Sequence, residues 1–308
     1  MCMIMQKLDL ENRIDLFRGC VAPGVRMTEK LIEFYREPAP RLVRARSASG
    51  VRIALVTDAV EMEYAIVCGE VSRAIFTTDI AVDGKICTVE GNGPHRMTFA
   101  PGEKEIVIHL PHLVIVEKIE LSFNDGAIVK AAPVRDKKIL ICGDSILQGM
   151  TCTTPTKAVG TLLAEKLGME FHNTSVGGAD MRHEAVAETL SLGGDVIAVG
   201  FGINDAFHNT TFESFRKETR KTLQLLDGFS GKAFVIVPIP CLNDAAGKSQ
   251  AYRQIIREEL EKFPGIIAVE GEAFYPAEDS FFADGTHPND KGMELYAENL
   301  ARIIGANL

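Results

Sequence analysis

Up to about residue 135, apolar and polar residues alternate in short runs along the chain. Alternation with a period of two predicts strands that bury one face and expose the other. The runs that predict strands are residues 51–57, 64–68, 74–77, 105–110 and 114–123. The one helical pattern that we find in this part is weak and covers residues 28–35. Many short strands joined by turns are typical of a β-sandwich.

Residues 79–90 predict a hairpin within this β-rich part. Asp83 and Gly84 separate the apolar segments 80–82 and 86–89. Asp-Gly suits the tight two-residue turn of a hairpin, because both positions need a positive φ.

After residue 136 the pattern changes to strands that alternate with helices. The predicted strands are residues 138–142, 170–173, 195–199, 233–237 and 266–269. The predicted helices are residues 157–167, 180–190, 249–262 and 290–304, and one that runs from a capping box at 210–213 to about Leu226. Such alternation predicts a parallel sheet with helices on both faces.

The change of pattern predicts two domains. The chain has 308 residues, which is more than one hydrophobic core usually serves. Pro133 lies in the stretch 131–136, where one pattern gives way to the other. We therefore expect a β-sandwich over residues 1–134 and an α/β domain over residues 135–308.

Charge and cysteine content narrow the classes of partner and location. The net charge is −9 and the pI is about 5.4, so neither nucleic acid nor an anionic membrane is an expected partner. No run is long enough to span a membrane, and the first residues do not have the pattern of a signal peptide. Seven cysteines are scattered without a Cys-x-x-Cys pair, which predicts free thiols and a cytoplasmic location.

Candidate catalytic residues lie in loops that follow the predicted strands. In an open parallel sheet the site forms beyond the carboxyl ends of the strands. Ser145 follows the first of these strands, and Asp284 and His287 follow the last. Ser145 is the expected nucleophile and His287 the expected general base, while Asp284 would orient the imidazole through Nδ1.

Two further residues could hold a developing negative charge. Gly178 and Asn204 lie in the loops after the second and third strands of this domain. The backbone N–H groups of Ser145 and Gly178, with the side-chain amide of Asn204, could bind an oxyanion. Gly178 lacks a Cβ atom, which would let a substrate oxygen approach its backbone. Pro288 would occupy the first turn of the last helix and hold His287 at its start.

These blocks resemble those of the SGNH hydrolases, also called GDSL esterases. The blocks are Gly143-Asp144-Ser145, Gly178, Gly202-x-Asn204-Asp205 and Asp284-x-x-His287-Pro288, and the resemblance covers residues 137–308. Ile146 stands where the first block usually has leucine. The resemblance implies the roles given above, a five-stranded sheet in flavodoxin-like order, and an esterase that needs neither metal nor cofactor.

A β-sandwich ahead of such a domain also resembles a subset of carbohydrate esterases with a jelly-roll front domain. This resemblance implies a short acyl group, acetyl, on a saccharide or another small metabolite. The chain has no tryptophan, which argues against a dedicated polysaccharide-binding surface. The alternatives are a lysophospholipase or acyl-thioesterase on the same site, or a carbohydrate-binding protein without activity. A strand edge of the sandwich could pair with a second copy to give a homodimer.

The sequence gives weaker indications of a functional role for the remaining histidines. His109 and His112 are separated by Pro111 in an extended segment, so we do not expect a metal site there. His172, His183 and His208 could line the cleft, and His208 lies close to Asn204 in the sequence.

Overall fold

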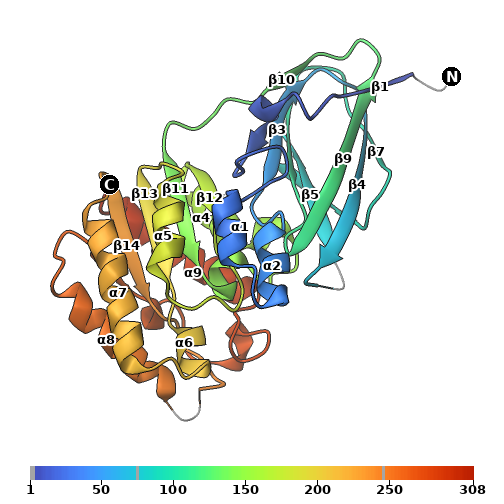
Figure 1. The fold of residues 1–308 in the computed structure, drawn as a ribbon. Coiled ribbons are helices and arrows are strands. Elements are labelled where there is room, and N and C mark those ends of the chain that lie inside the picture. The colour runs from blue at the N-terminus through green and yellow to red at the C-terminus, as the bar shows by residue number, and fades with distance from the viewer. Residues whose placement is uncertain (1–3, 74–75, 245–246) are drawn as a thin grey trace.

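The computed structural model describes residues 4–73, 76–244 and 247–308. Figure 1 shows a β-rich region that contains the N-terminus and, beside it, a region of alternating strands and helices that ends at the C-terminus. Among the described residues, no helix combines the length and the apolar character needed to cross a bilayer.

The β-rich region consists of two antiparallel sheets. The first has the order β1 (Met5–Lys7), β9 (Val114–Asn124), β4 (Glu61–Val71) and β7 (His95–Thr98). The second has the order β10 (Val129–Ala131), β3 (Arg52–Thr57), β8 (Lys104–His109), β5 (Thr77–Val82) and β6 (Lys85–Glu90), with β2 (Phe17–Arg18) beside β3. Ile53 of β3 and Met62 of β4 belong to one buried cluster. The two sheets therefore share a core, which confirms the predicted β-sandwich.

The predicted hairpin is present between β5 and β6. Val82 pairs with Lys85, and the turn residues Asp83 and Gly84 have φ angles of 47° and 78°. Of the strand predicted at residues 74–77, residues 74 and 75 lie outside the described residues, and β5 begins at Thr77.

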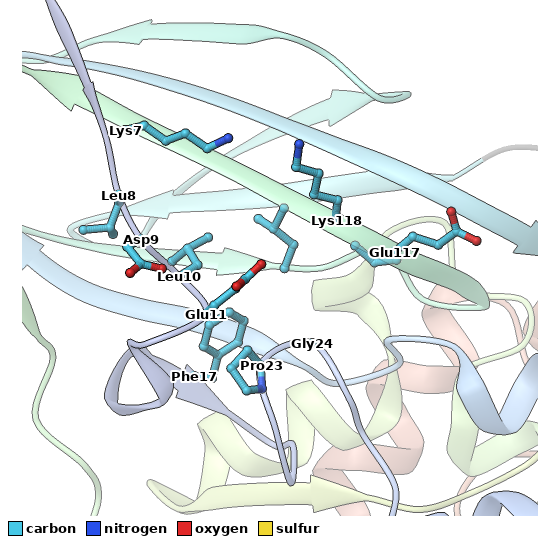
Figure 2. A pocket seen from close by; sticks show the side chains of 12 residues that line it. Lys7, Leu8, Asp9, Leu10, Glu11, Phe17, Pro23, Gly24, Glu117 and Lys118 are labelled. Carbon is cyan, nitrogen blue, oxygen red and sulfur yellow. The ribbon is translucent and has the colours of Figure 1, made fainter.

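A cavity of about 440 Å³ lies on the sandwich between the N-terminal segment and β9 (Figure 2). Side chains of both charges line it, including Lys7, Glu11 and Lys118. Its one aromatic residue, Phe17, is buried. This cavity therefore offers no exposed aromatic face on which a sugar ring could stack.

The second region is built on one parallel sheet. Its order is β12 (Glu170–Asn173), β11 (Lys138–Gly143), β13 (Val196–Gly200), β14 (Lys232–Val237) and β15 (Ile267–Glu270). In chain order this is 2-1-3-4-5, the flavodoxin-like arrangement that the resemblance implied. The central strands β11 and β13 are largely apolar and buried, as expected for a sheet covered on both faces.

Helices cover both faces of this sheet. Among the described residues, the helices are α1 (Glu29–Phe34), α2 (Ala39–Arg46), α3 (Ser145–Gln148), α4 (Val159–Leu167), α5 (His183–Leu190), α6 (Ile203–Phe207), α7 (Phe212–Asp227), α8 (Lys248–Leu260) and α9 (Asp290–Gly305). Short 3-10 turns lie at Ile14–Leu16, Pro155–Lys157, Gly271–Ala273 and Asp279–Phe281. Residues of α4 and α9 pack on one face of the sheet, and residues of α5, α7 and α8 pack on the other.

The sandwich region also contributes to the core of the α/β region. Leu31 of α1 and Ala45 of α2 belong to the same buried cluster as Leu140 and Val199 of the sheet. Figure 1 shows α1 between α5 and α2. The helices α1 and α2 therefore join the two regions, and a domain division at residue 134 stays a prediction.

Some predicted boundaries were wrong for local reasons. The helix predicted from residue 180 begins at His183, because the Asp180 carboxylate binds Arg41 and His208 instead of capping a helix. The last helix begins at Asp290, as predicted, and its N-cap Asn289 accepts a hydrogen bond from the Gly292 N–H group. Pro288 therefore lies outside the helix, contrary to prediction.

Candidate active site

Ser145 lies at the turn from β11 into α3. The side chain of Asp144 caps α3 by accepting a hydrogen bond from the Ile146 N–H group at 2.9 Å. A Cβ atom on Gly143 would lie 2.5 Å from the Gly200 carbonyl oxygen, so this turn requires glycine. Ser145 is only 6% exposed, and the rigid turn therefore fixes the position of its hydroxyl group.

His287 and Asp284 share one tight turn near Ser145. The Oγ atom of Ser145 lies 2.8 Å from Nε2 of His287. The Nδ1 atom of His287 lies 2.7 Å from Oδ2 of Asp284, and Oδ1 of Asp284 accepts the His287 backbone N–H at 2.8 Å. The structure thus brings together the three residues that the sequence proposed as nucleophile, base and orienting acid.

The charge of Asp284 determines which ring nitrogen of His287 carries the proton. Partial burial raises the pKa of Asp284, but hydrogen bonds from the backbone and ring of His287 and from the Thr286 N–H outweigh this effect, so the pKa lies below its usual value. An ionised carboxylate only accepts hydrogen bonds, so Nδ1 donates to it. In the neutral ring Nε2 is then the acceptor that faces the Ser145 hydroxyl.

Gly178 lies in the loop after β12, and a hydrogen bond joins this loop to Asn204. Asn204 lies in the short helix α6, and its Nδ2 atom donates to the Ala179 carbonyl oxygen at 2.9 Å. Gly178 has a φ of +80°, which favours glycine. A Cβ atom there would lie 3.2 Å from Nη1 of Arg44. The missing Cβ therefore leaves room for Arg44 of α2 beside the backbone of Gly178.

Gln148 supports the loop of Gly178, and the sequence analysis did not identify it. Its Oε1 atom accepts the Gly177 N–H at 2.7 Å, and its Nε2 atom donates to the Arg44 carbonyl oxygen at 2.8 Å. Gln148 lies one turn after Ser145 in α3. This spacing of three residues from the nucleophile is the feature of the sequence from which its role could have been predicted.

Two carboxylic acids beside the site are buried. Burial raises the pKa of Asp144 to about 7, against the opposing effect of the Ile146 N–H. Burial also raises the pKa of Asp205 to about 6, and its Oδ2 atom accepts the Met181 N–H at 2.9 Å. Both acids hold loops by accepting hydrogen bonds from backbone N–H groups.

Of the three histidines that could line the cleft, His208 contacts the loop of Gly178. Its Nδ1 atom lies 2.6 Å from the Asp180 carboxylate. His172 lies in β12 and binds the Arg26 carbonyl oxygen at 2.6 Å. Burial lowers the pKa of His172 to about 4, which keeps this core residue neutral.

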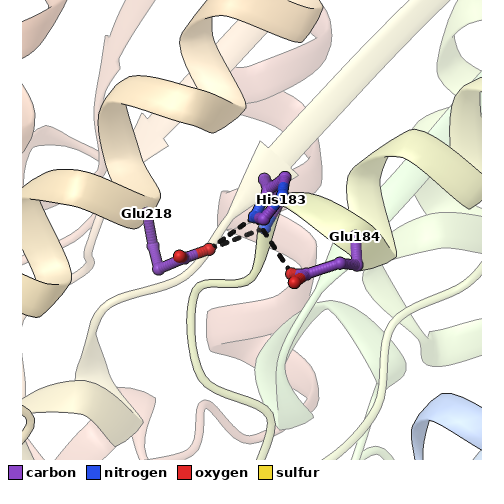
Figure 3. Close-up of side chains that lie close together, drawn as sticks. All are labelled: His183, Glu184 and Glu218. Carbon is purple, nitrogen blue, oxygen red and sulfur yellow. Dashed lines mark hydrogen bonds and ion pairs between the residues drawn. The ribbon is translucent and has the colours of Figure 1, made fainter.

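His183 belongs to a cluster between α5 and α7 (Figure 3). Its Nδ1 atom lies 3.0 Å from Glu184 and 2.7 Å from Glu218. Donor atoms of these three residues lie within 4.8 Å of one another, as metal ligands could. The Lys221 ammonium group lies 3.6 Å from Glu218, so a cation already neutralises part of this charge.

Comparisons with known proteins agree with this architecture. The model of the GDSL-like lipase/acylhydrolase family matches residues 141–295, which is just over half of the chain. A search of curated protein sequences finds no match.

Solved structures share the fold along nearly the whole chain. A salicylyl-acyltransferase from a tetracycline biosynthetic pathway has 19% identity and a TM-score of 0.82, with 94% of each chain covered. A GDSL-like lipase from Bacteroides ovatus has 17% identity and a TM-score of 0.79, with 99% of this chain and 98% of that chain covered. An acetyl xylan esterase from the rumen bacterium Butyrivibrio proteoclasticus has 13% identity and a TM-score of 0.61, with 99% of both chains covered.

The matched segment contains all five of the predicted site residues. The fold, the position of the match and the four sequence blocks lead to the same assignment. The chain belongs to the GDSL-like lipase/acylhydrolase family and is an ester hydrolase.

Proposed function

We propose that the protein is a serine esterase that hydrolyses short-chain esters, acetyl esters above all, of a carbohydrate or another small metabolite. The observation that carries this proposal is the continuous hydrogen-bonded series from Ser145 through His287 to Asp284, with contacts of 2.8 and 2.7 Å. A serine hydroxyl in such a series can transfer its proton to the imidazole as it attacks a carbonyl carbon.

The reaction then has two halves. Ser145 Oγ attacks the ester carbonyl, its proton moves to Nε2 of His287, and the alcohol leaves with that proton. Water then attacks the acyl-enzyme and gives a proton to His287, which passes it to Ser145 Oγ as the bond to the acyl group breaks and the acid leaves. In both halves, the N–H groups of Ser145 and Gly178 and the Asn204 amide would stabilise the oxyanion.

The proposed substrate class draws support from the fold comparison. The neighbour from Butyrivibrio proteoclasticus is an acetyl xylan esterase and covers this chain from the sandwich to the last helix. A lysophospholipase or thioesterase would need an apolar surface for a long acyl chain.

The neighbour that is an acyltransferase favours a second candidate. The same acyl-enzyme could pass its acyl group to an alcohol in place of water. Product analysis in the presence of an added alcohol separates ester exchange from hydrolysis.

Rates on the 4-nitrophenyl esters of acetate, butyrate and octanoate test the proposal, with Ser145→Ala beside the wild type. We expect the highest kcat/KM for acetate and loss of turnover in Ser145→Ala. A preference for octanoate would move the assignment to lipids or thioesters. Equal rates for the wild type and the variant would remove Ser145 from the reaction.

A further inference from the structure

Two arginines of the N-terminal region lie against the loop of Gly178. Arg41 and Arg44 are three residues apart on α2, so they lie on the same face of that helix. A Cβ atom on Gly178 would lie 3.2 Å from Nη1 of Arg44 and 3.8 Å from Nε of Arg41. Both guanidinium groups therefore adjoin the backbone that is proposed to bind the oxyanion.

The two arginines differ in their partners. Arg41 forms an ion pair with Asp180 at 2.8 Å, and Asp180 also binds His208. Arg44 donates to the Gly177 carbonyl oxygen at 2.9 Å and to the Ser72 hydroxyl at 3.2 Å. Within residues 4–73, 76–244 and 247–308, no carboxylate forms an ion pair with Arg44. The pair with Asp180 offsets one positive charge, and the charge of Arg44 remains.

The unpaired charge of Arg44 is unfavourable in the absence of a second anion. Partial burial lowers the pKa of Arg44, and the neighbouring Arg41 lowers it further. The backbone of Arg44 is nevertheless fixed, since its carbonyl oxygen accepts hydrogen bonds from Gln148 and Ser47. A neutral side chain could donate to Gly177 and Ser72 equally well. A bound anion would offset the cost of placing two cations together in an otherwise acidic chain.

We propose that Arg41 and Arg44 form an anion-binding subsite beside Gly178 that binds a carboxylate group of the ester substrate. The planar guanidinium group matches the geometry of a carboxylate. The subsite rests on the proposed function, because it places the anion next to the carbonyl that Ser145 would attack. The carboxylate can belong either to the acyl group, as in a half-ester of a dicarboxylic acid, or to the alcohol, as in an acetylated sugar acid.

Two pairs of esters test the subsite and separate these sources. For the acyl group, mono-4-nitrophenyl succinate is compared with 4-nitrophenyl 4-methylpentanoate, in which an isopropyl group replaces the carboxylate. For the alcohol, 3-acetoxybenzoate is compared with 3-isopropylphenyl acetate. We expect the wild type to favour the anionic ester in one pair. Arg44→Gln should lower that anionic-to-neutral ratio of kcat/KM by about 10- to 100-fold, and Arg44→Lys should restore part of it.

Controls separate binding of the anion from support of the fold. Arg46→Gln removes an exposed arginine from the same helix and should leave both ratios unchanged. Equal ratios in the wild type and in Arg44→Gln would overturn the subsite, as would an equal loss for charged and neutral esters. A further test uses the wild type alone. At constant ionic strength, we expect benzoate to inhibit the reaction and benzamide not to inhibit it. If Ser145→Ala lost activity on all four esters, the esterase proposal would stand even if the tests ruled out the subsite.

Discussion

His287 links the two other members of the proposed triad through its two ring nitrogens. Asp284 engages Nδ1 and the backbone N–H of His287 together, which fixes both the tautomer and the orientation of the ring. The types and order of these residues in the sequence were enough to predict this set. The surroundings of Gly178 were harder to predict, because Arg44, which lies next to the position of its missing Cβ, comes more than 100 residues earlier in the chain.

Asn204→Ala tests the proposed oxyanion donor. The amide nitrogen carries two hydrogens and donates one to the Ala179 carbonyl oxygen, which leaves the other for the substrate. Loss of this donor should lower kcat on 4-nitrophenyl acetate by about 10²- to 10³-fold, with a smaller change in KM. Asn12→Ala, at an exposed position, is the matched control. An unchanged kcat in Asn204→Ala would exclude this residue as an oxyanion donor.

Asp144→Asn tests the buried acid beside the nucleophile. Since folding raises the pKa of Asp144 to about 7 from a usual value of 3.8, the folded state holds this proton more tightly than the unfolded state. The resulting stabilisation is complete below about pH 4 and is lost as the pH rises through about 7. Urea unfolding should therefore show that Asp144→Asn gains stability relative to the wild type from pH 4 to pH 7. A constant difference would contradict the raised pKa, and Asp125→Asn is an exposed control.

At the scale of elements, three segments meet around Gln148. The side chain joins α3 to the carbonyl oxygen of Arg44 in α2 and to the Gly177 N–H in the loop of Gly178. This glutamine therefore couples the position of Ser145 to the position of the proposed oxyanion donors.

Gln148→Ala should destabilise the fold and slow the reaction. The Gly177 N–H would lose its acceptor in a buried setting, which costs about 1–3 kcal/mol of unfolding free energy. We expect kcat to fall because the loop of Gly178 loosens, while labelling of Ser145 continues. Gln254→Ala, which removes an exposed contact within α8, should change neither quantity. Full stability and activity in Gln148→Ala would refute the coupling.

The parallel sheet could be predicted well, but α2 could not. Each strand from β11 to β15 lies within one or two residues of its predicted bounds, because runs of buried Val and Ile give a strong signal. The segment of α2 carries Pro38 before it and Pro40 in its first turn, which is typical of a loop. Proline is nevertheless tolerated in the first turn of a helix. The contacts of Arg41 and Arg44 with distant residues could not be predicted from the local sequence pattern.

At the scale of the whole molecule, α1 and α2 make the sandwich region part of the esterase core. Leu31 is 1% exposed and packs in the cluster that contains the α/β sheet. The helices α1 and α2 and the active site should therefore unfold together, in one thermal transition.

Leu31→Ala tests this dependence. Removal of a fully buried leucine should lower the free energy of unfolding by about 2–5 kcal/mol. Thermal inactivation of the esterase should shift to lower temperature together with the unfolding transition followed by circular dichroism. Ile14→Ala, at a residue that is 50% exposed, should shift neither. Inactivation at an unchanged temperature would show that the α/β region is stable without these helices.

In the proposed mechanism, His287 activates Ser145 for covalent catalysis. Labelling with a fluorophosphonate probe, followed by mass spectrometry of the peptides, tests it most directly. We expect one adduct on Ser145 in the wild type, none in Ser145→Ala, and labelling in His287→Ala that is slower by orders of magnitude. An unlabelled Ser145 in the folded wild type, or equal labelling rates with and without His287, would contradict the account.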